Sequence, residues 1–347
     1  MSLNRLARLV DLKEALTCLQ QGKLVAFPTE TVYGLGADAS NRDAVAKLYL
    51  AKGRPPDHPI IVHVASPKKE SIDLETDWLE ILSPWWRDIP DLALRLIFTF
   101  WPGPLTLVLE KSKTALDALT GGQKTLALRA PSHPLAQELL RAFGGGIAGP
   151  SANRFGRVSP TSAMDVLNEF PNQDGIAVLD GGNCAFGIES TIIDLSDSSA
   201  IRLLRPGSIT PEMIKKKTGI DVRKAVEGET LTRVSGSLKA HYAPHTPLTL
   251  YAEHTLPDLL KTNSLKKIAL LIWNQPPLIE LQNKHHTFIQ IPMDSNGFAR
   301  NLYRYLRDLD HGQYDLILMP ETPSGQNWDG VRDRLQRAAF GSGAASD

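Results

Sequence analysis

Short apolar segments of strand length recur through the first 207 residues and restrict the chain to folds built around a β-sheet. These segments are 24–27, 60–64, 105–109, 125–129, 176–179, 191–195 and 201–204. Helical periodicity marks 11–21, 42–51 and 134–143, and glycines follow the first two of these stretches. Because several strand segments lie close together, we expect an α/β fold with a mixed or partly antiparallel sheet, not a uniform βαβ repeat.

The character of the chain changes after Arg205-Pro206-Gly207. Residues 226–247 are polar and turn-prone and have no apolar periodicity, which is typical of a linker. From residue 248 the pattern is strand, helix, strand, strand, helix, strand and helix, with strands at 248–251, 268–273, 288–291 and 316–319 and the later helices near 296–309 and 331–339. We therefore predict a first domain at 1–207, a linker at 208–247 and a smaller α/β domain at 248–347.

Composition excludes several classes of protein. Hydrophobic residues make up 42% and charged residues 22%, as in ordinary globular chains, which excludes disorder as the main state. The 38 basic and 38 acidic residues cancel, so no whole-chain field would attract nucleic acid or an anionic membrane. Cys18 and Cys184 lie far apart without CxxC spacing, which favours a reducing cytoplasm over a disulfide framework or a cysteine zinc site. Neither a signal peptide nor a membrane-spanning segment is expected.

Two loop segments carry groups suited to phosphate or nucleotide binding. Lys52 and Arg54 flank a glycine at a helix end, where an ammonium and a planar guanidinium could meet phosphate oxygens. Standing alone, such a pair is more often an ordinary solvated basic turn. The segment 149–160, GPSANRFGRVSP, could present hydroxyls, amides and cations to a nucleotide, or could be a loop of Asx and Ser turns. No GxxxxGK[ST] motif occurs.

Further candidates are the hydroxyls of Thr29 and Thr31, which follow the first buried strand and could hold a small polar substrate or simply form a turn. The nine histidines show no metal-binding spacing. His63, in an apolar strand, is expected to be a core or pocket-edge residue.

The motifs in combination resemble those of the YrdC-like threonylcarbamoyl-adenylate synthases. They are PTETVYGLG (28–36), KGRPPDHPIIVHV (52–64), WPGPLT (101–106), LRAPSHP (128–134), PSANRFGRVSPT (150–161), ESTIID (189–194) and LLRPG (203–207). KAHYAPHTP at 239–247 is similar to the linker motif of the longer members, and FARNLYRYLRDLD (298–310) and DRLQRAA (333–339) are similar to their second domain. The resemblance implies a YrdC-like twisted mixed sheet flanked by helices, a linker, and a smaller Rossmann-like domain.

The resemblance also implies an activity. Members of this family make threonylcarbamoyl-AMP and pyrophosphate from L-threonine, bicarbonate and ATP with magnesium, the first step towards N6-threonylcarbamoyladenosine in tRNA. A carbamate formed from threonine and bicarbonate would attack the α-phosphorus of ATP. The protein would then chiefly position reactants and neutralise charge, without a protein nucleophile. Mg²⁺ would bridge phosphate oxygens, with no metal site made by the protein itself.

By resemblance, Lys52 and Arg54 are the catalytic pair and also bind ATP. The remaining ATP-binding positions are His58, Thr125, Ser151, Asn153, Ser159, Arg205 and Tyr242. The L-threonine positions are Thr31, His63, Arg129, Gly149 and Ser190, with Arg129 suited to a carboxylate. Two positions depart from the family pattern: His58 stands where asparagine is common, and Gly149 where a small side chain is common. His241 and Tyr242 are expected to fold over the cavity as a lid.

Two alternatives stay open at this stage. A double-stranded RNA-binding module without catalysis is one, although zero net charge argues against strong RNA affinity. A carbamoyl-transfer module is the other, but the related hydrogenase-maturation proteins carry zinc-finger cysteines that two distant cysteines cannot supply. Candidate macromolecular partners are tRNA and the downstream threonylcarbamoyl transferase.

Overall fold

The structure is a computed structural model that describes residues 7–343 apart from 69, 172–174, 198, 225–228, 230–231 and 274–284. The chain divides into two compact units. The first unit comprises Met1–Phe155 and Ser159–Ser237, and the second comprises Gly156–Val158 and Leu238–Asp347. Of the segment predicted as a linker, 208–237 belongs to the first unit and 238–247 to the second, with 225–228 and 230–231 outside the described residues.

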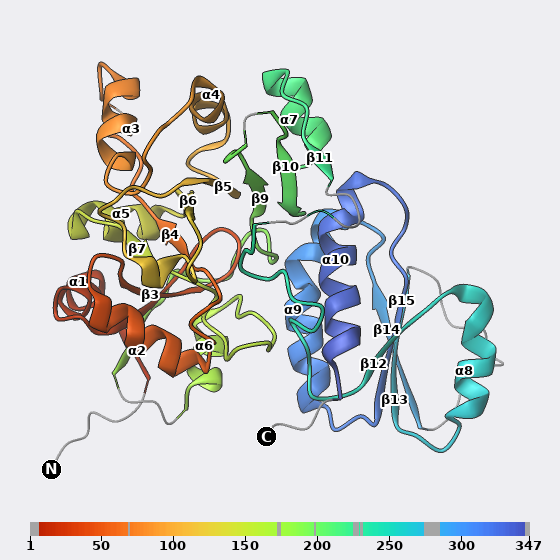
Figure 1. The fold of residues 1–347 in the computed structure, drawn as a ribbon. Helices are drawn as coiled ribbons and strands as arrows, with labels where there is room; N and C mark the ends of the chain where they lie inside the picture. The colour runs from red at the N-terminus through yellow and green to blue at the C-terminus, as the bar shows by residue number, and fades with distance from the viewer. Residues whose placement is uncertain are drawn as a thin grey trace, which may run out of the picture. The chain divides into compact units, whose positions relative to one another are not determined.

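The first unit is built on an eleven-stranded mixed sheet with helices around it (Figure 1). In spatial order its strands are β1 (Arg8–Val10), β8 (Ile176–Leu179), β2 (Leu24–Phe27), β3 (Gly34–Asp38), β7 (Ile147–Ala148), β4 (Ile61–His63), β6 (Thr125–Arg129), β5 (Leu105–Glu110), β9 (Thr191–Asp194), β10 (Arg202–Arg205) and β11 (Arg223–Lys224). Its helices are α1 (Leu12–Gln20), α2 (Arg42–Lys52), α3 (Leu74–Leu82), α4 (Asp91–Phe100), η1 (Asp117–Leu119), α5 (Pro134–Phe143), α6 (Ala163–Glu169) and α7 (Pro211–Thr218). Parallel pairs such as β4 with β6 and antiparallel pairs such as β5 with β6 confirm the predicted mixed sheet.

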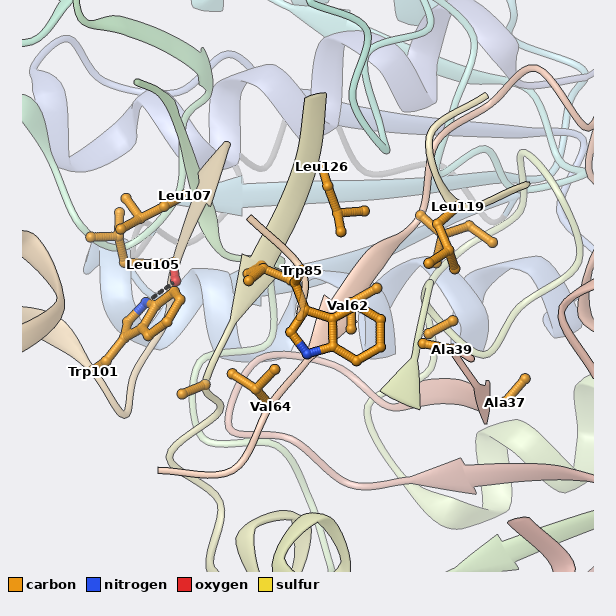
Figure 2. Close-up of a cluster of buried hydrophobic side chains, with 14 of the residues drawn as sticks. Ala37, Ala39, Val62, Val64, Trp85, Trp101, Leu105, Leu107, Leu119 and Leu126 are labelled. Atoms are coloured by element: carbon orange, nitrogen blue, oxygen red, sulfur yellow. Dashed lines mark hydrogen bonds between the residues drawn. The ribbon is translucent and has the colours of Figure 1, made fainter. Parts of the chain in front are cut away.

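Side chains of the central strands pack into separate cores on the two faces of this sheet. In β2, Leu24 and Ala26 join one cluster, whereas Val25 and Phe27 join another, as the alternation of strand side chains requires. The larger cluster includes Val62, Trp85 and Trp101, and Figure 2 shows the indole of Trp101 hydrogen-bonded to the carbonyl of Leu105. Burial on both faces explains why the strand segments read as continuous apolar runs.

Strand β3 and helices α3 and α4 were not predicted from the sequence. Strand β3 contains Gly34 and Gly36, which lower its apolar signal. A Cβ at Gly34 would lie 2.9 Å from the ring of Phe27, and one at Gly36 would lie 2.8 Å from the side chain of Ile147. The glycines are therefore needed for close packing of β3 against its neighbours, and this packing is not visible in a hydropathy pattern.

The second unit contains a four-stranded parallel sheet in the order β12 (Leu248–Tyr251), β15 (Leu316–Pro320), β13 (Ile268–Trp273) and β14 (His286–Ile291). Its helices are η2 (Glu253–Thr255), α8 (Leu256–Thr262), α9 (Ser295–His311) and α10 (Gln326–Gly341). Figure 1 shows α9 and α10 on one side of the sheet and α8 on the other. The predicted small α/β domain is confirmed. None of the described helices combines the length and apolarity needed to cross a bilayer.

Candidate functional site

In the first unit, the loops and strand ends that carry the predicted residues are joined by buried hydrogen bonds. His63 and Arg129 are paired in register at the ends of the parallel strands β4 and β6. Both side chains are buried, which is unusual for charged or titratable residues and requires compensating partners.

Arg129 is held by three groups. Its Nη1 donates to Thr31 Oγ1 at 2.8 Å, its Nε donates to the carbonyl of Gly103 at 3.2 Å, and its Nη2 forms an ion pair with Glu30 Oε1 at 2.6 Å. The other oxygen of Glu30 accepts the backbone N–H of Ser132 at 3.0 Å. Thr31 and Arg129 are thus brought together as the resemblance implied. Glu30 was missed, because its role depends on the buried ion pair with Arg129, which is distant in the chain.

His63 is buried beside this guanidinium. Burial, together with the positive charge of Arg129, lowers the pKa of His63 to about 3, so its imidazole is neutral at physiological pH. Its ring lies edge-on to Phe27, with 5.4 Å between centroids. A Cβ at Gly149 would lie 2.9 Å from His63 Nδ1 and 3.0 Å from the Phe27 ring. The glycine at this position therefore fits the tight packing of these two rings.

A second hydroxyl and cation group lies at the start of β9. Arg205 Nη2 donates to Ser190 Oγ at 3.0 Å, and its Nε donates to the Ser190 carbonyl at 3.0 Å. The Ser190 hydroxyl is also hydrogen-bonded to the Thr106 hydroxyl at 2.7 Å. Thr106 is fully buried, and the sequence did not predict it as a site residue. Arg205 Nη1 donates to the carbonyl of Ser235 at 2.8 Å. Arg205 and Ser190 were assigned to different substrates, but they share these contacts.

Lys52 points inward from the end of α2. Its ammonium donates to the carbonyl of Ser151 at 2.5 Å and to that of Asn153. The helix ends here because Gly53 adopts a left-handed φ of 61°, which turns the chain away. Burial and the neighbouring Arg54 lower the pKa of Lys52 well below its usual value. Lys52 therefore fixes the turn at Ser151 and Asn153.

Arg54 lies against the loop that follows it. Its Nη2 donates to the carbonyl of Pro59 at 2.8 Å, and its guanidinium lies 5.6 Å from the centre of the Phe155 ring. His58 packs edge-on against the same ring at 5.0 Å. Burial and the charge of Arg54 lower the pKa of His58. A histidine here thus gains an aromatic contact.

Three other predicted residues of the first unit also have defined surroundings. Ser159 donates to Glu189 Oε1 at 2.6 Å, and both side chains are buried. Asn153 Nδ2 donates to the carbonyl of Arg154 at 2.7 Å. Thr125, at the start of β6, lines a small pocket of about 10 Å³.

The segment 232–235 forms one wall of that pocket, which the sequence did not predict. The backbone N–H of Arg233 donates to Gln123 Oε1 at 2.8 Å, and Gln123 Nε2 donates to the Arg233 carbonyl at 2.9 Å. Val234 is buried in a small cluster with Ile61 and Ala127. Reciprocal hydrogen bonds and apolar burial therefore fasten this segment beside Thr125.

Tyr242 belongs to the second unit, where α9 and α10 hold it. It stacks on Tyr303 with 5.7 Å between ring centroids, and the guanidinium of the fully buried Arg334 lies 5.3 Å from its ring centre. Its backbone has a φ of 60°, an uncommon value for a tyrosine. The ring of His241 lies 4.1 Å from that of Tyr242. The resemblance assigned Tyr242 to ATP, and in the second unit its ring and backbone are firmly fixed.

The described part of the chain does not present a cluster of metal ligands. Within the described residues, no three His, Cys, Asp or Glu side chains are grouped so that they could hold an ion. The buried carboxylates of Glu30 and Glu189 are engaged by Arg129 and Ser159. The protein groups at this site are thus mainly cations and hydroxyls, which suit anionic ligands better than a bare cation.

Fold and site together define the class: an α/β protein in which a twisted mixed sheet carries a buried group of cations and hydroxyls. A family model described as "Telomere recombination", covering Sua5, YciO and YrdC proteins, matches residues 17–207. A model described as "Threonylcarbamoyl-AMP synthase, C-terminal domain" matches residues 209–340. The chain belongs to the Sua5, YciO and YrdC family, and to its two-domain Sua5 branch.

Relatives match along nearly the whole chain. The threonylcarbamoyl-AMP synthase of Pyrococcus abyssi is 36% identical, with 92% of each chain covered. That of Bacillus subtilis is also 36% identical, over 95% of this chain and 93% of the relative. The crystal structure of P. abyssi Sua5 complexed with L-threonine superposes with a TM-score of 0.80 at 34% identity, covering 97% of this chain and 98% of that one.

Proposed function

We propose that this protein is an L-threonylcarbamoyladenylate synthase, which makes threonylcarbamoyl-AMP and pyrophosphate from L-threonine, bicarbonate and ATP. The observation that carries the proposal is the buried set Thr31, Arg129, His63 and Ser190, in which Ser190 is hydrogen-bonded to the buried cation Arg205. Lys52 and Arg54 are further buried cations of the same unit. The relatives named threonylcarbamoyl-AMP synthase match over more than nine-tenths of their length, which favours this activity over the RNA-binding alternative.

In this proposal, Arg129 binds the carboxylate of L-threonine. Glu30 and Gly103 already fix the orientation of the guanidinium, so little conformational freedom is lost when the substrate arrives. The hydroxyls of Thr31 and Ser190 accept or donate hydrogen bonds to the amino acid. The neutral imidazole of His63 can accept a hydrogen bond from the threonine amine, or donate one to the carbamate.

The ATP-binding positions are proposed on the same basis. Lys52 and Arg54 place positive charge near the turn at Ser151 and Asn153, where the nucleotide phosphates would lie. Polyphosphate would favour the protonated form of Lys52, whose pKa is lowered by burial in the free protein. Thr125, Ser159, Arg205, His58 and Tyr242 complete the proposed set.

The chemical step needs position and charge compensation. A carbamate oxygen attacks the α-phosphorus, the bond to the β-phosphate oxygen breaks, and pyrophosphate leaves with the electron pair. Cationic side chains compensate the charge that develops on the leaving group. Mg²⁺ would arrive on the phosphate oxygens of ATP and supply further charge neutralisation. We further propose tRNA modification in the cytoplasm as the setting, with the adenylate passed to a threonylcarbamoyl transferase.

The test is a complete reaction with purified protein, ATP, magnesium, bicarbonate and radiolabelled L-threonine, in which pyrophosphate and threonylcarbamoyl-AMP are both measured. Product that requires threonine and bicarbonate together is expected. L-serine replaces threonine in one control, and a second control omits bicarbonate. Pyrophosphate release without threonine, or ATP binding without product, would contradict the proposal.

A further inference from the structure

The first unit contains a large cleft, and none of the proposed site residues lines it. It has a volume of about 1060 Å³ and lies between the loop after β4, helix α3 and the C-terminal end of α5. Its apolar lining includes Val64, Ile72, Ile81, Trp85 and Leu140. Figure 2 shows the Trp85 indole next to Val62 and Val64. Val64 and Trp85 belong to one core cluster of the sheet and Leu140 to the other, so residues from both faces line the cleft.

The cleft is acidic on one side. From its N-cap Asp73 to Leu82, helix α3 carries Asp73, Glu75, Asp77 and Glu80 and has no lysine or arginine. Asp73, Asp77 and Glu80 line the cleft together with Glu70, against two cations, Lys68 and Arg141. The whole chain has no net charge, so this excess of carboxylates is a local feature.

Apolar surface is exposed in the same place. The Ile72 side chain is fully exposed, and Leu74 and Leu79 of α3 are 47% and 37% exposed. Exposed apolar groups rimmed by charge are typical of interaction sites. Pockets for small molecules have volumes of roughly 300–1,000 Å³, so this cleft can take several side chains of a partner.

We propose that this cleft binds a basic amphipathic helix of a partner protein. Leucine-like side chains on one face of that helix enter between Trp85, Ile81 and Leu140, and lysines or arginines on its flanks reach Asp77 and Glu80. Complementary charge selects this partner over acidic segments and over nucleic acid, whose phosphates the carboxylates repel. This surface is independent of the proposed synthase reaction.

The experiment uses the full-length protein and a fluorescein-labelled synthetic helix of about 14 residues, made of leucine and lysine in an amphipathic pattern. Fluorescence anisotropy is expected to show saturable binding in the micromolar range. Raising NaCl from about 0.1 M to 0.5 M should weaken binding by roughly tenfold, because the contacts of lysines with exposed carboxylates are screened. A leucine and glutamate helix of the same pattern should bind at least tenfold more weakly.

Three variants localise the site. The double variant Asp77→Lys/Glu80→Lys is expected to weaken binding of the lysine helix by tenfold or more. Glu75→Lys is the matched control, since Glu75 lies on α3 outside the cleft lining, and it should bind within about twofold of the unchanged protein. Ile72→Ser, at a fully exposed position, should weaken binding with little effect on its salt dependence.

Several outcomes would overturn the proposal. They are absence of saturable binding, equal binding of the leucine and glutamate helix, and equal loss of binding in Glu75→Lys and in the double variant. Circular dichroism of each variant confirms that its fold is kept, so that a loss of binding reports on the cleft.

Discussion

Arg129 Nη2 lies 2.6 Å from Glu30 Oε1, and both side chains are more than nine-tenths buried. Glu30→Gln would leave the guanidinium with an uncompensated charge inside the protein. We expect the free energy of unfolding to fall by about 3–5 kcal/mol, as measured by urea denaturation. Glu75→Gln, at an exposed position, should change it by less than about 0.5 kcal/mol. A loss below about 1 kcal/mol in Glu30→Gln would contradict the assignment of a buried ion pair.

Acid should destabilise the protein partly through His63. Its pKa is about 3 in the folded protein and near 6.5 in the unfolded chain, so the unfolded chain takes up the proton first. The stabilising contribution of the neutral ring is complete above pH 6.5 and is lost as the pH falls from there towards 3. The full contribution is roughly 5 kcal/mol. Unfolding measured from pH 7 to 4 should show a shallower loss for His63→Gln, and parallel pH profiles would refute this account.

Lys52→Met should disturb the turn that carries Ser151 and Asn153, because the carbonyls of both residues lose the hydrogen bond that the Lys52 ammonium donates. Under the proposed function, kcat/KM for ATP should fall by about a hundredfold or more. Steady-state kinetics with varied ATP at saturating threonine measure this effect. Lys47→Met removes a cation from the exposed side of the same helix and should leave the kinetics unchanged. Unaltered kinetics in Lys52→Met would remove Lys52 from the proposed site.

Gly149→Ala would place a Cβ 2.9 Å from His63 Nδ1 and 3.0 Å from the Phe27 ring. One of these buried rings must move, so we expect the free energy of unfolding to fall by about 1–3 kcal/mol. The KM for L-threonine should rise more than the KM for ATP, each compared with the unchanged protein. Gly145→Ala is a suitable control, since its new methyl group would meet only the Phe143 side chain, at 3.2 Å. Identical KM values for threonine in Gly149→Ala and the unchanged protein would show that the position does not shape the amino-acid pocket.

Tyr242 allows backbone strain to be separated from side-chain packing. Tyr242→Ala and Tyr242→Gly both remove the stacking on Tyr303, but only glycine tolerates the φ of 60° without strain. The glycine variant should therefore be more stable than the alanine variant by about 1 kcal/mol. Thermal unfolding of the two full-length variants gives the comparison. Equal stability, or a more stable alanine variant, would show that the left-handed backbone is not maintained in solution.

The sequence predicted those parts of the fold that depend on apolar periodicity. Strands β2, β6 and β8 and helix α5 begin and end at the predicted residues, because each is a short buried segment bounded by turns or caps. Strand β3 could not be predicted in this way, since its glycines are required by close contacts with the Phe27 and Ile147 side chains in the folded sheet, and Ile147 is distant in the sequence.

The candidate site was only partly accessible from the sequence. The positions of Arg129, Thr31 and Ser190 followed from motif resemblance, and the structure joins Arg129 to Thr31 and Ser190 to Arg205. Thr106 and Glu30 were missed because their importance depends on buried partners and not on a local pattern. The pairing of Gln123 with Arg233 joins positions far apart in the chain, so no spacing rule could indicate it.

Residues Gly156–Val158 are synthesised long before the residues that they contact in the folded protein, and this affects how the chain can fold. These three residues belong to the second unit, where the Gly156 carbonyl accepts the N–H of Ala243 at 2.9 Å and Arg307 donates to the Val158 carbonyl. On the ribosome they emerge among residues of the first unit, long before Ala243 and Arg307 exist as partners. A nascent chain must therefore keep this segment accessible while the parts of the first unit on either side of it fold. For the same reason, no single cleavage of the finished chain yields two complete units.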